Sequence, residues 1–591
     1  MKLPLSVLVV VHTAEMEVLL LERAQRPGFW QSVTGSLDHP DEAFEHAAAR
    51  ELREETGIEA ADGRLRRWNV AYTFEIYAHW RHRFAPGVTH NTEHLFSLEL
   101  AKPAPVTLAP QEHTAFGWLP WREAARKCFS WSNRDAIVMV GAALLAAGCA
   151  TGTKDLAPHL RAGAPEVREC AAWYQALDSE IDAAGVRNAQ DARIAGFPHL
   201  RVSRFLAGLR ERAAENDRTL RAYAERLTEL DQEARRHEIQ NLPTLPTEAA
   251  RTNALRRVRD CGRILRAADL ASHDARAALL AAAQVPDERS AVPAASEEAW
   301  QRRVLTVFQT GSDPSVQRVR YAPPSGQRLP RSVIAGLLGR AAFDPLGHLA
   351  LTAREVDRLA ATYAPTFEIE TRADYDRFGW LRWRRGMSLP QVDAAEPTVY
   401  VHAAYTRYGE HLLLQLVYTL WFPERPARDT FDPGAGPLNG VVWRVTLAPD
   451  GEPLVYDAIH ACGCFHVFFP TARARPRPAL PHATTDAFVP QRLPGAGEDQ
   501  RPVVTLTSAT HDIEGVRLER APESLVRYAL RPYDDLLSMP RLVGDHRSAF
   551  GADGRIAGSP ARQWGRQPTA ASGRRHFDDA DLLERRFELH L

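Results

Sequence analysis

Three glutamates in the first tenth of the chain have a spacing that could hold a metal ion. Glu51, Glu54 and Glu55 stand at i, i+3 and i+4, so a helix places all three on one face. Exposed like charges at this spacing repel by about 0.2–0.5 kcal/mol per pair, and a cation among them removes that repulsion. Oxygen ligands suit Mg²⁺, with Mn²⁺ as the alternative ion. The spacing therefore predicts a divalent-cation site. A solvated acidic face paired with Arg50 and Arg53 is the other interpretation of these residues alone.

Residues 35–58 surround this helix and read GSLDHPDEAFEHAAARELREETGI. They resemble the Nudix family pattern: Gly, five residues, Glu, seven residues, Arg-Glu, an apolar residue, any residue, Glu-Glu, any residue, Gly and an apolar residue. The places of this pattern are filled by Gly35, Glu42, Arg50, Glu51, Leu52, Glu54, Glu55, Gly57 and Ile58. One departure is that six residues separate Gly35 from Glu42. Because an insertion in a loop is tolerated better than one in a helix, we expect it to affect the Gly35 end of the site and not the carboxylates.

Three segments outside this motif indicate a subfamily. They are RPGFWQSVTGS at 26–36, FEIYAHWRHRFAPGVTHNTEHLF at 74–96 and SWSNR at 130–134. These segments are similar to the bacterial dihydroneopterin triphosphate pyrophosphohydrolases of folate synthesis. The resemblance covers about residues 1–138 and implies an α/β Nudix fold, a mixed sheet sandwiched by helices. It also implies Mg²⁺-dependent hydrolysis of dihydroneopterin triphosphate to dihydroneopterin monophosphate and pyrophosphate.

The resemblance also implies roles for individual residues. The metal ligands would be Glu51, Glu55 and Glu112, and the catalytic residues would be Arg50 together with Glu54 or Glu112 as the base that takes a proton from water. Substrate contacts are implied for Lys2, Arg23, Thr34, Phe74, Glu75, Ile76, Tyr77 and Ser130. Lys2 and Arg23 suit a triphosphate, and Phe74 suits a flat pterin ring. Without the resemblance, Arg23 would be interpreted as a surface cation and Phe74 as a core residue.

Two other functions are consistent with the same residues. A Nudix hydrolase could prefer nucleoside triphosphates such as dATP or 8-oxo-dGTP, because the motif does not name the substrate. Alternatively, the domain could be a catalytically inactive binding module fused to an envelope lipoprotein. The sequence favours an enzyme, because Glu51, Glu54, Glu55 and Glu112 are all present.

The bulk composition describes an ordinary globular chain of several domains. The chain has 591 residues, 45% hydrophobic and 25% charged, with a formal net charge of -1. This near-neutral balance gives no argument for a nucleic-acid partner, and six cysteines do not form a disulfide framework. We expect a Nudix domain at 1–140, a helical region at 151–295, an α+β domain of unknown function at 296–550 and a largely mobile tail at 551–591.

The join at residues 136–150 reads AIVMVGAALLAAGCA and is apolar on every helical face. Its 12 apolar residues at 136–147 are too few to span a membrane comfortably. The segment resembles the signal and lipobox of a bacterial lipoprotein, in which Cys149 would be cleaved and lipidated. That origin would anchor residues 149–591 to the membrane on the periplasmic side and leave residues 1–135 in the cytoplasm. The alternative is a buried helix that packs on the Nudix sheet.

Two further patterns lie beyond the join. Leu220, Tyr223, Leu227 and Leu230 recur at helical spacing, the NLPTLPTEAAR stretch interrupts the pattern, and Leu255, Val258, Ile264 and Leu265 continue it, which predicts a packed helix pair. Farther on, His460, Cys462, Cys464 and His466 alternate, so a strand would place them on one face, where a bend at Gly463 is needed for a shared metal. Buried small residues or a disulfide are the favoured interpretations of this second pattern.

Overall fold

The chain forms two compact units, Met1–Gly152 and Thr153–Leu591, each with its own core. The structure is a computed structural model. It describes residues 2–591 except 77, 131, 142–155, 287–293, 311–315, 327, 342, 385–386, 388, 428–434, 479–486, 521–525, 543–544 and 570–574. Within the described residues, no helix combines the length and apolar character needed to cross a membrane.

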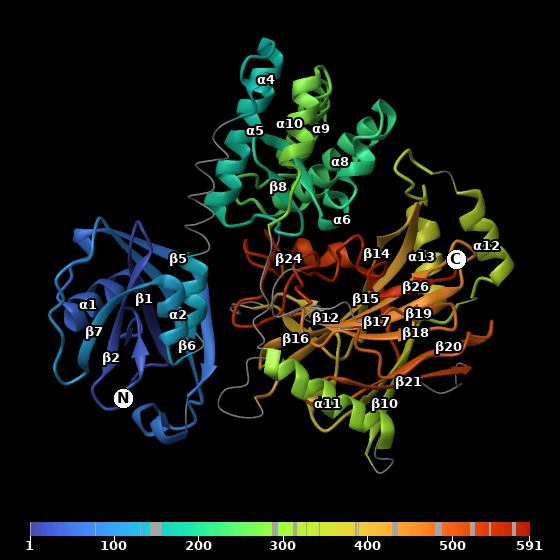
Figure 1. The fold of residues 1–591 in the computed structure, drawn as a ribbon. Helices are drawn as coiled ribbons and strands as arrows, with labels where there is room; N and C mark the ends of the chain where they lie inside the picture. The colour runs from blue at the N-terminus through green and yellow to red at the C-terminus, as the bar shows by residue number, and fades with distance from the viewer. Residues whose placement is uncertain are drawn as a thin grey trace. The chain divides into compact units, whose positions relative to one another are not determined.

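The N-terminal unit is built on one mixed sheet (Figure 1). Its main path runs β3-β2-β1-β6-β5, with β4 paired to β1 and β7 paired to β2. β1 and β6 are parallel over nine residue pairs, and the other pairings are antiparallel. The elements are β1 (Leu5–Thr13), β2 (Glu17–Arg23), β3 (Trp30–Gln31), β4 (Val33–Ser36), α1 (Phe44–Thr56), η1 (Ala60–Asp62), β5 (Arg64–Glu75), η2 (Ala78–Arg83), β6 (His90–Leu100), β7 (His113–Pro120), α2 (Trp121–Lys127) and a helix over residues 132–141.

Helices cover both faces of this sheet because its central strand is apolar on both sides. Val7 and Val9 of β1 pack with Ala48 and Leu52 of α1. The alternate residues Leu8 and Val10 pack with α2 and with the helix over 132–141. Side chains alternate between the faces of a strand, so a run such as LSVLVVV needs cover on both. The predicted α/β fold, a sheet sandwiched by helices, is confirmed.

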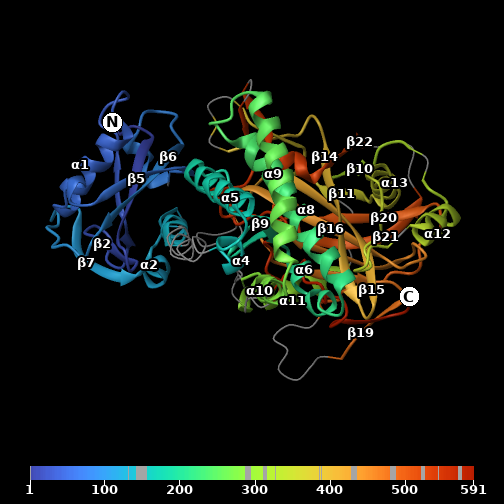
Figure 2. The same cartoon turned by 90° about the horizontal axis from the view of Figure 1, so that it is seen from above.

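The second unit begins with a helical region, shown from above in Figure 2. The α8–α9 pair occupies the predicted positions, and Tyr223, Leu227, Val258 and Leu265 are buried in its core. α8 ends at Asn241 and α9 starts after the Thr247 cap, so the interruption falls where the proline-containing stretch predicts it. The elements are α4 (Pro158–Arg161), α5 (Pro165–Ala184), β8 (Ala192–Ile194), β9 (Phe197–Val202), α6 (Arg204–Ala207), α7 (Arg210–Ala213), α8 (Asp217–Asn241), α9 (Glu248–Asp269), α10 (His273–Ala282) and α11 (Ala294–Thr310).

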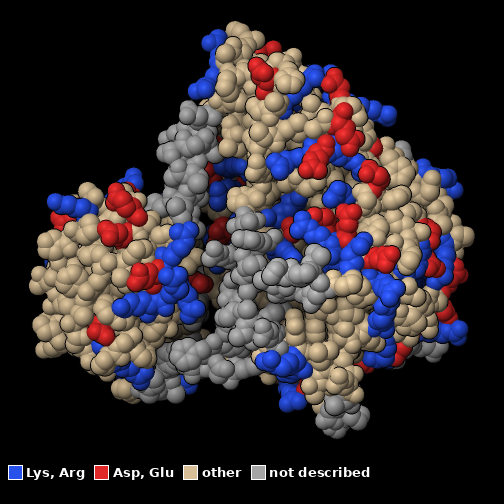
Figure 3. Space-filling view, in the orientation of Figure 1, with Lys and Arg blue, Asp and Glu red and all other residues tan. Residues whose placement is uncertain are grey.

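Two features of this region were not predicted from the sequence. Cys170 of α5 and Cys261 of α9 form a disulfide across 91 residues of sequence. Arg235 and Arg201 are fully buried, and Arg201 donates to Glu238 at 2.7 Å. On the surface, Figure 3 shows basic and acidic side chains interspersed on the face it draws, in keeping with the net charge of -1.

The rest of the second unit is rich in β-strands, as predicted. A six-stranded sheet runs β18-β17-β16-β15-β14-β23, and a five-stranded sheet runs β21-β20-β11-β10-β22. One core joins the two sheets with α12 and α13. The elements are β10 (Arg318–Ala322), α12 (Arg331–Arg340), α13 (Ala353–Tyr363), β11 (Thr366–Glu370), η3 (Asp374–Asp376), β12 (Trp380–Arg382), β13 (Gln391–Asp393), β14 (Thr398–Tyr408), β15 (His411–Arg425), β16 (Gly436–Leu447), β17 (Pro453–His460), β18 (Val467–Pro470), β19 (Ala474–Pro476), β20 (Gln500–Leu506), β21 (Ile513–Arg520), β22 (Val526–Arg527), β23 (Ala529–Pro532), η4 (Tyr533–Leu537), β24 (Met539–Leu542), β25 (Asp545–Arg547) and β26 (Phe587–Leu589).

The C-terminal segment is packed against the six-stranded sheet, and the expectation of a largely mobile tail is corrected for its described residues. Phe577 is fully buried against Val417 and Val442, and Phe587 is fully buried in a neighbouring cluster. The physical reason is that β15 is buried on both faces, so its second face also needs an apolar cover. The high Arg, Gly and Ser content of the tail predicts a mobile segment, although its few aromatic residues supply this cover.

The alternating His and Cys residues do not share one strand. β17 ends at His460, and a turn in which Gly463 N donates to His460 O at 2.8 Å leads back into β18. His460 Nε2 lies 3.5 Å from Asp512, whereas His466 Nε2 lies 2.8 Å from Asp457. The two histidines thus have different partners. Cys462 and Cys464 are buried, and neither forms a disulfide with a described residue.

The structure describes only the first part of the apolar segment at residues 136–150. The helix over 132–141 buries Ala136, Ile137 and Val140 against the Nudix sheet. This arrangement agrees with the buried-helix interpretation for the first part of the apolar segment. The remainder of the segment, including Cys149, lies outside the described residues.

Candidate active site

Helix α1 carries the predicted carboxylates and ends beside the sheet. Gly57 caps it in the left-handed conformation, with φ 69°, and its N–H donates to Arg53 O at 3.0 Å. A residue with a side chain is strained at this φ, which explains the glycine. Along the last turns Glu55 is buried, Glu51 is half-buried, and Glu54 is exposed to solvent.

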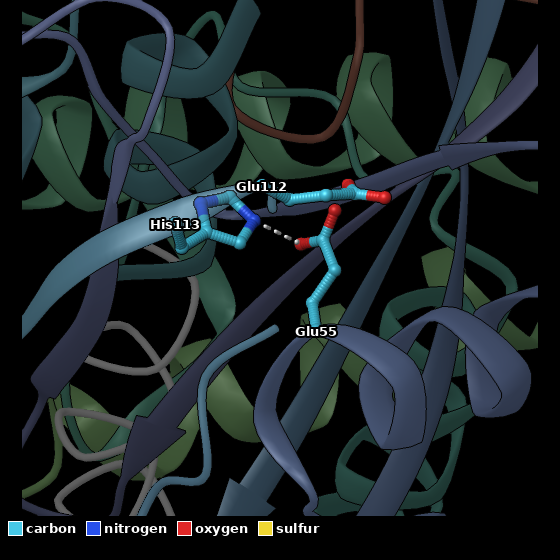
Figure 4. Close-up of side chains that lie close together, drawn as sticks. All are labelled: Glu55, Glu112 and His113. Atoms are coloured by element: carbon cyan, nitrogen blue, oxygen red, sulfur yellow. Dashed lines mark ion pairs between the residues drawn. The ribbon is translucent and has the colours of Figure 1, made fainter. Parts of the chain in front are cut away.

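Three side chains from two elements converge at this end of the helix. Glu55 comes from α1, His113 is the first residue of β7, and Glu112 directly precedes that strand (Figure 4). One ligand atom from each lies within 4.8 Å of the others. His113 Nε2 is 3.3 Å from Glu55 Oε2, and the backbone N–H of Thr34 donates to the same oxygen at 3.3 Å. Glu112 remains exposed, so the cluster opens to solvent.

Burial sets the electrostatics of this cluster. Loss of solvent raises the pKa of Glu55, and the neighbouring Glu112 carboxylate adds to the rise, while His113 opposes it. Burial, together with the charge of Glu55, raises the pKa of Glu51 to about 7, although Arg50 opposes that shift. Burial thus opposes the charged form of both carboxylates, and a cation beside them would offset that cost.

Arg50 forms hydrogen bonds with three residues of the motif. Its Nη1 donates to Glu51 Oε1 at 2.8 Å, its Nε donates to Glu42 Oε1 at 3.2 Å, and its Nη2 donates to the Ser36 carbonyl at 3.0 Å. Burial alone would lower the pKa of Arg50, but these carboxylates raise it above its ordinary value. Arg50 therefore links helix α1 to the loop that begins at Gly35 and Ser36.

The extra loop residue leaves Gly35 beside the carboxylates. A Cβ atom built on Gly35 would lie 1.7 Å from the Glu51 carboxylate carbon. The inserted residue is accommodated between Leu37 and Glu42, where Asp38 N donates to Glu42 Oε2 at 2.7 Å. A side chain at position 35 would therefore displace the Glu51 carboxylate, which Arg50 holds in place.

Several predicted substrate residues lie near the carboxylates. Arg23 pairs with His113 across β2 and β7 and interacts electrostatically with Glu55 and Glu112. Burial lowers the pKa of Arg23. Thr34 reaches the cluster through the backbone hydrogen bond described above. Lys2 is exposed, and its backbone N–H donates to the Arg83 carbonyl at 2.8 Å.

The remaining predicted contacts lie on other parts of the sheet. Phe74, at the end of β5, packs with the core on the face opposite α1, and Ile76 is buried. The side chain of Glu75 and the whole of Tyr77 lie outside the described residues. Ser130 accepts a hydrogen bond from Asn133 N at 3.2 Å and so caps the helix over 132–141.

Two features of the N-terminal unit were missed by sequence reasoning. His113 is a tertiary neighbour of Glu55, and its only sequence signal is that it directly follows Glu112. The second feature is the burial of Ser32, Asn91 and Glu93, each of which has an oxygen without a hydrogen-bond partner among the described residues. Burial raises the pKa of Glu93 to about 7, although Ser132 hydrogen-bonds to its carboxylate.

The residues present fit a divalent cation. The carboxylates of Glu55 and Glu112 supply oxygen ligands of the kind that Mg²⁺ and Mn²⁺ prefer. Glu51 adjoins Glu55 but is held by Arg50, and it stands outside the three-residue set. The assignment of Glu51 as a ligand stays a prediction.

Comparison with known proteins identifies the class of this unit. Residues 2–139 match the model of the NUDIX domain family. This unit also covers most of the length of curated relatives from the same family. The chain therefore belongs to the Nudix family through its N-terminal domain.

Within the family, the domain is similar to dihydroneopterin triphosphate diphosphatases. It is 44% identical over 139 residues to that of Escherichia coli (strain K12), which covers 23% of this chain and 91% of the relative. It is 38% identical over 135 residues to that of Haemophilus influenzae, which covers 22% of this chain and 84% of the relative. The solved Escherichia coli dihydroneopterin triphosphate pyrophosphohydrolase matches at 44% identity over 23% of this chain and 93% of its own, with a TM-score of 0.22. The rest of the chain stays unassigned.

Proposed function

We propose that the N-terminal unit hydrolyses dihydroneopterin triphosphate to dihydroneopterin monophosphate and pyrophosphate, with Mg²⁺ as its ion. The convergence of Glu55 and Glu112 at the end of α1 carries this proposal. The 44% identity to a diphosphatase of that substrate supports the choice of substrate within the family.

Glu55 and Glu112 would hold the ion, and Glu51 would join them if Arg50 releases it. A bound divalent ion supplies charge neutralisation for the phosphate oxygens. Arg50 then has a positioning role, because its contacts with Glu42, Glu51 and Ser36 fix the helix against the glycine loop.

A carboxylate of the site accepts the proton of the attacking water. Glu54 and Glu112 are both exposed at the site, so each can reach a water molecule. Arg50 Nη1 donates to Glu54 Oε2 at 3.3 Å, a contact that orients this carboxylate. We propose one of these two as the general base.

The cations near the site suit a triphosphate. Arg23 is close enough to Glu55 and Glu112 to bind phosphate oxygens that also contact the ion. Lys2 is the other proposed phosphate contact. Phe74, Ile76 and Ser130 are proposed to contact the pterin end of the substrate.

The test is a comparison of pyrophosphate release from dihydroneopterin triphosphate, dATP and 8-oxo-dGTP by the full chain with Mg²⁺. The proposal predicts a clear preference, measured as kcat/KM, for the pterin. A higher kcat/KM for dATP or 8-oxo-dGTP would instead support a nucleotide hydrolase. A folded chain without activity on any of the three would support the binding-module alternative.

A further inference from the structure

A second group of ligand-type side chains lies in the other unit, where α8 meets η4. Glu233 and His237 stand at i and i+4 on α8, so they share one helix face. Asp534 of η4 faces them, although it is distant in sequence. One ligand atom of each of the three lies within 4.8 Å of the others.

His237 is the residue of this group that packing does not explain. Its side chain is 3% exposed, and its Nδ1 is 2.9 Å from Ser538 Oγ. Its Nε2 has no hydrogen-bond partner among the described residues and lies 3.6 Å from Glu233 Oε1. A proton on Nδ1, donated to Ser538, leaves the Nε2 lone pair directed at the carboxylates. A hydrogen bond of this kind, made by the ring nitrogen that does not bind the ion, orients metal-ligating histidines.

The separations are those of ligands that share an ion. Two ligands bound to one zinc ion at about 2.0–2.1 Å in tetrahedral geometry stand roughly 3.3 Å apart. The 3.6 Å between His237 Nε2 and Glu233 Oε1 is close to that value. A carboxylate oxygen of Glu233 and one of Asp534 also lie within 4.8 Å of each other, and two carboxylates this close favour a cation beside them.

Arg236 contributes one positive charge beside the carboxylates of Glu233 and Asp534. It pairs with Glu233 and lies 3.2 Å from Asp534, but its side chain is 52% exposed. A guanidinium group has no lone pair and donates only, and Arg236 is not bonded to His237. It can therefore swing into solvent when an ion binds.

The three side chains are held in place before any ion arrives. α8 is joined to η4 by Asn241 Nδ2, which donates to Leu537 O at 2.8 Å, and to β25 by Gln240, whose Nε2 lies 3.2 Å from His546 Nδ1. Glu233 and Asp534 are 48% and 41% exposed, so an ion can enter from solvent.

We propose that Glu233, His237 and Asp534 bind one divalent transition-metal ion, with zinc the preferred ion and a coordination position open to solvent. One imidazole and two carboxylates suit zinc, and zinc sites with three protein ligands keep an open fourth position. This site lies in the second unit and does not depend on the activity proposed for the Nudix domain.

The test uses the full chain with Glu55→Gln, so that the Nudix cluster loses a ligand. Zinc affinity is measured by competition with a chromophoric chelator, and Co²⁺ absorbance reports the ligand environment. We expect one zinc ion per chain at this site. Asp534→Asn and Glu233→Gln should each weaken binding at least about tenfold, since each removes a charged ligand. His237→Gln should do the same and should change the Co²⁺ spectrum.

Two control variants sharpen the result. Glu225→Gln removes an exposed glutamate of the same helix and should leave affinity unchanged. Arg236→Gln removes the competing cation and should tighten zinc binding. The proposal is overturned if the folded chain binds no zinc beyond what the Asp534→Asn chain binds, or if Asp534→Asn and Glu233→Gln retain the parent affinity.

Discussion

Glu93 shows how a single buried carboxyl can control the stability of the Nudix domain. It is 5% exposed on β6, and burial raises its pKa from 4.5 to about 7. A raised pKa means that the folded state holds the proton more tightly than the unfolded state. Its contribution is therefore fully present below pH 4.5 and is lost as pH rises to about 7.

Glu93→Gln should therefore stabilise the domain at pH 8, because the amide never has to ionise in the core. The expected gain is about 3 kcal/mol at pH 8, falling towards zero near pH 4. Urea unfolding of the N-terminal transition at both pH values measures it. An equal change in unfolding free energy at the two pH values would contradict the assignment.

The glutamates of α1 could be predicted at this scale, whereas their partners could not. Glu51, Glu54 and Glu55 lie within one helix, so helical spacing alone places them together. His113 joins Glu55 only because β7 pairs with β2, a contact that no local pattern encodes. Glu93 occupies an ordinary strand position in the sequence, and its burial follows from the helix over 132–141 that covers that face.

At the scale of elements, direct contacts hold the loop that starts at Gly35 and Ser36 against helix α1. Gly35 lies directly under the Glu51 carboxylate, and Arg50 ties the loop carbonyl of Ser36 to the helix. With six residues between Gly35 and Glu42, Gly35 still lies beside Glu51.

Gly35→Ala should disrupt this contact, because its Cβ would overlap the Glu51 carboxylate. We expect a fall in kcat/KM of about 100-fold or more, equivalent to about 3 kcal/mol of transition-state stabilisation. Gly117→Ala, on β7, is the matched control because a Cβ there meets nothing within 4 Å. Equal activity of the two variants would show that the loop does not position Glu51.

The packed C-terminal segment illustrates a limit of composition as a predictor. Residues after 551 are rich in small and basic residues, which is typical of mobile chain. The few aromatic residues decide the outcome, because Phe577 and Phe587 cover a face of the sheet that would otherwise be exposed. The strands of that sheet were predictable, but the segment that covers them was not.

At the scale of the whole molecule, the two units differ in covalent constraint. The disulfide Cys170–Cys261 joins α5 to α9 in the second unit. Reduction should lower the unfolding free energy of that unit by about 2–4 kcal/mol, since the closed loop is long. Pyrophosphate release by the Nudix domain should not change.

Thermal unfolding with and without reductant, followed beside enzyme activity, measures both effects. A Cys170→Ala, Cys261→Ala double variant is the control and should be insensitive to reductant. Loss of Nudix activity on reduction would contradict the independence of the two units.

The disulfide also bears on location. We propose that Cys149 is a lipidation site and that residues 149–591 are periplasmic and membrane-anchored, with residues 1–135 cytoplasmic. Disulfides persist in oxidising compartments, so the Cys170–Cys261 bond supports export of the second unit. Burial of Ala136, Ile137 and Val140 in the Nudix fold means that processing would also remove part of that core.

Mass analysis of the expressed chain and its membrane fraction tests this proposal. A lipid-modified fragment that begins at Cys149 is the expected product, and Cys149→Ser should abolish it. An intact, unmodified chain from a host that processes lipoproteins would contradict it.

The measurement that tests the central claim most directly is pyrophosphate release from dihydroneopterin triphosphate by the full chain and by its Glu55→Gln variant. The wild-type chain should release pyrophosphate in the presence of Mg²⁺. Glu55→Gln should reduce kcat/KM at least about 1000-fold, because the ion loses a carboxylate that offsets phosphate charge. Glu45→Gln, which changes an exposed glutamate of the same helix, should retain activity. Full activity in a folded Glu55→Gln chain would contradict the assignment of this cluster as the active site.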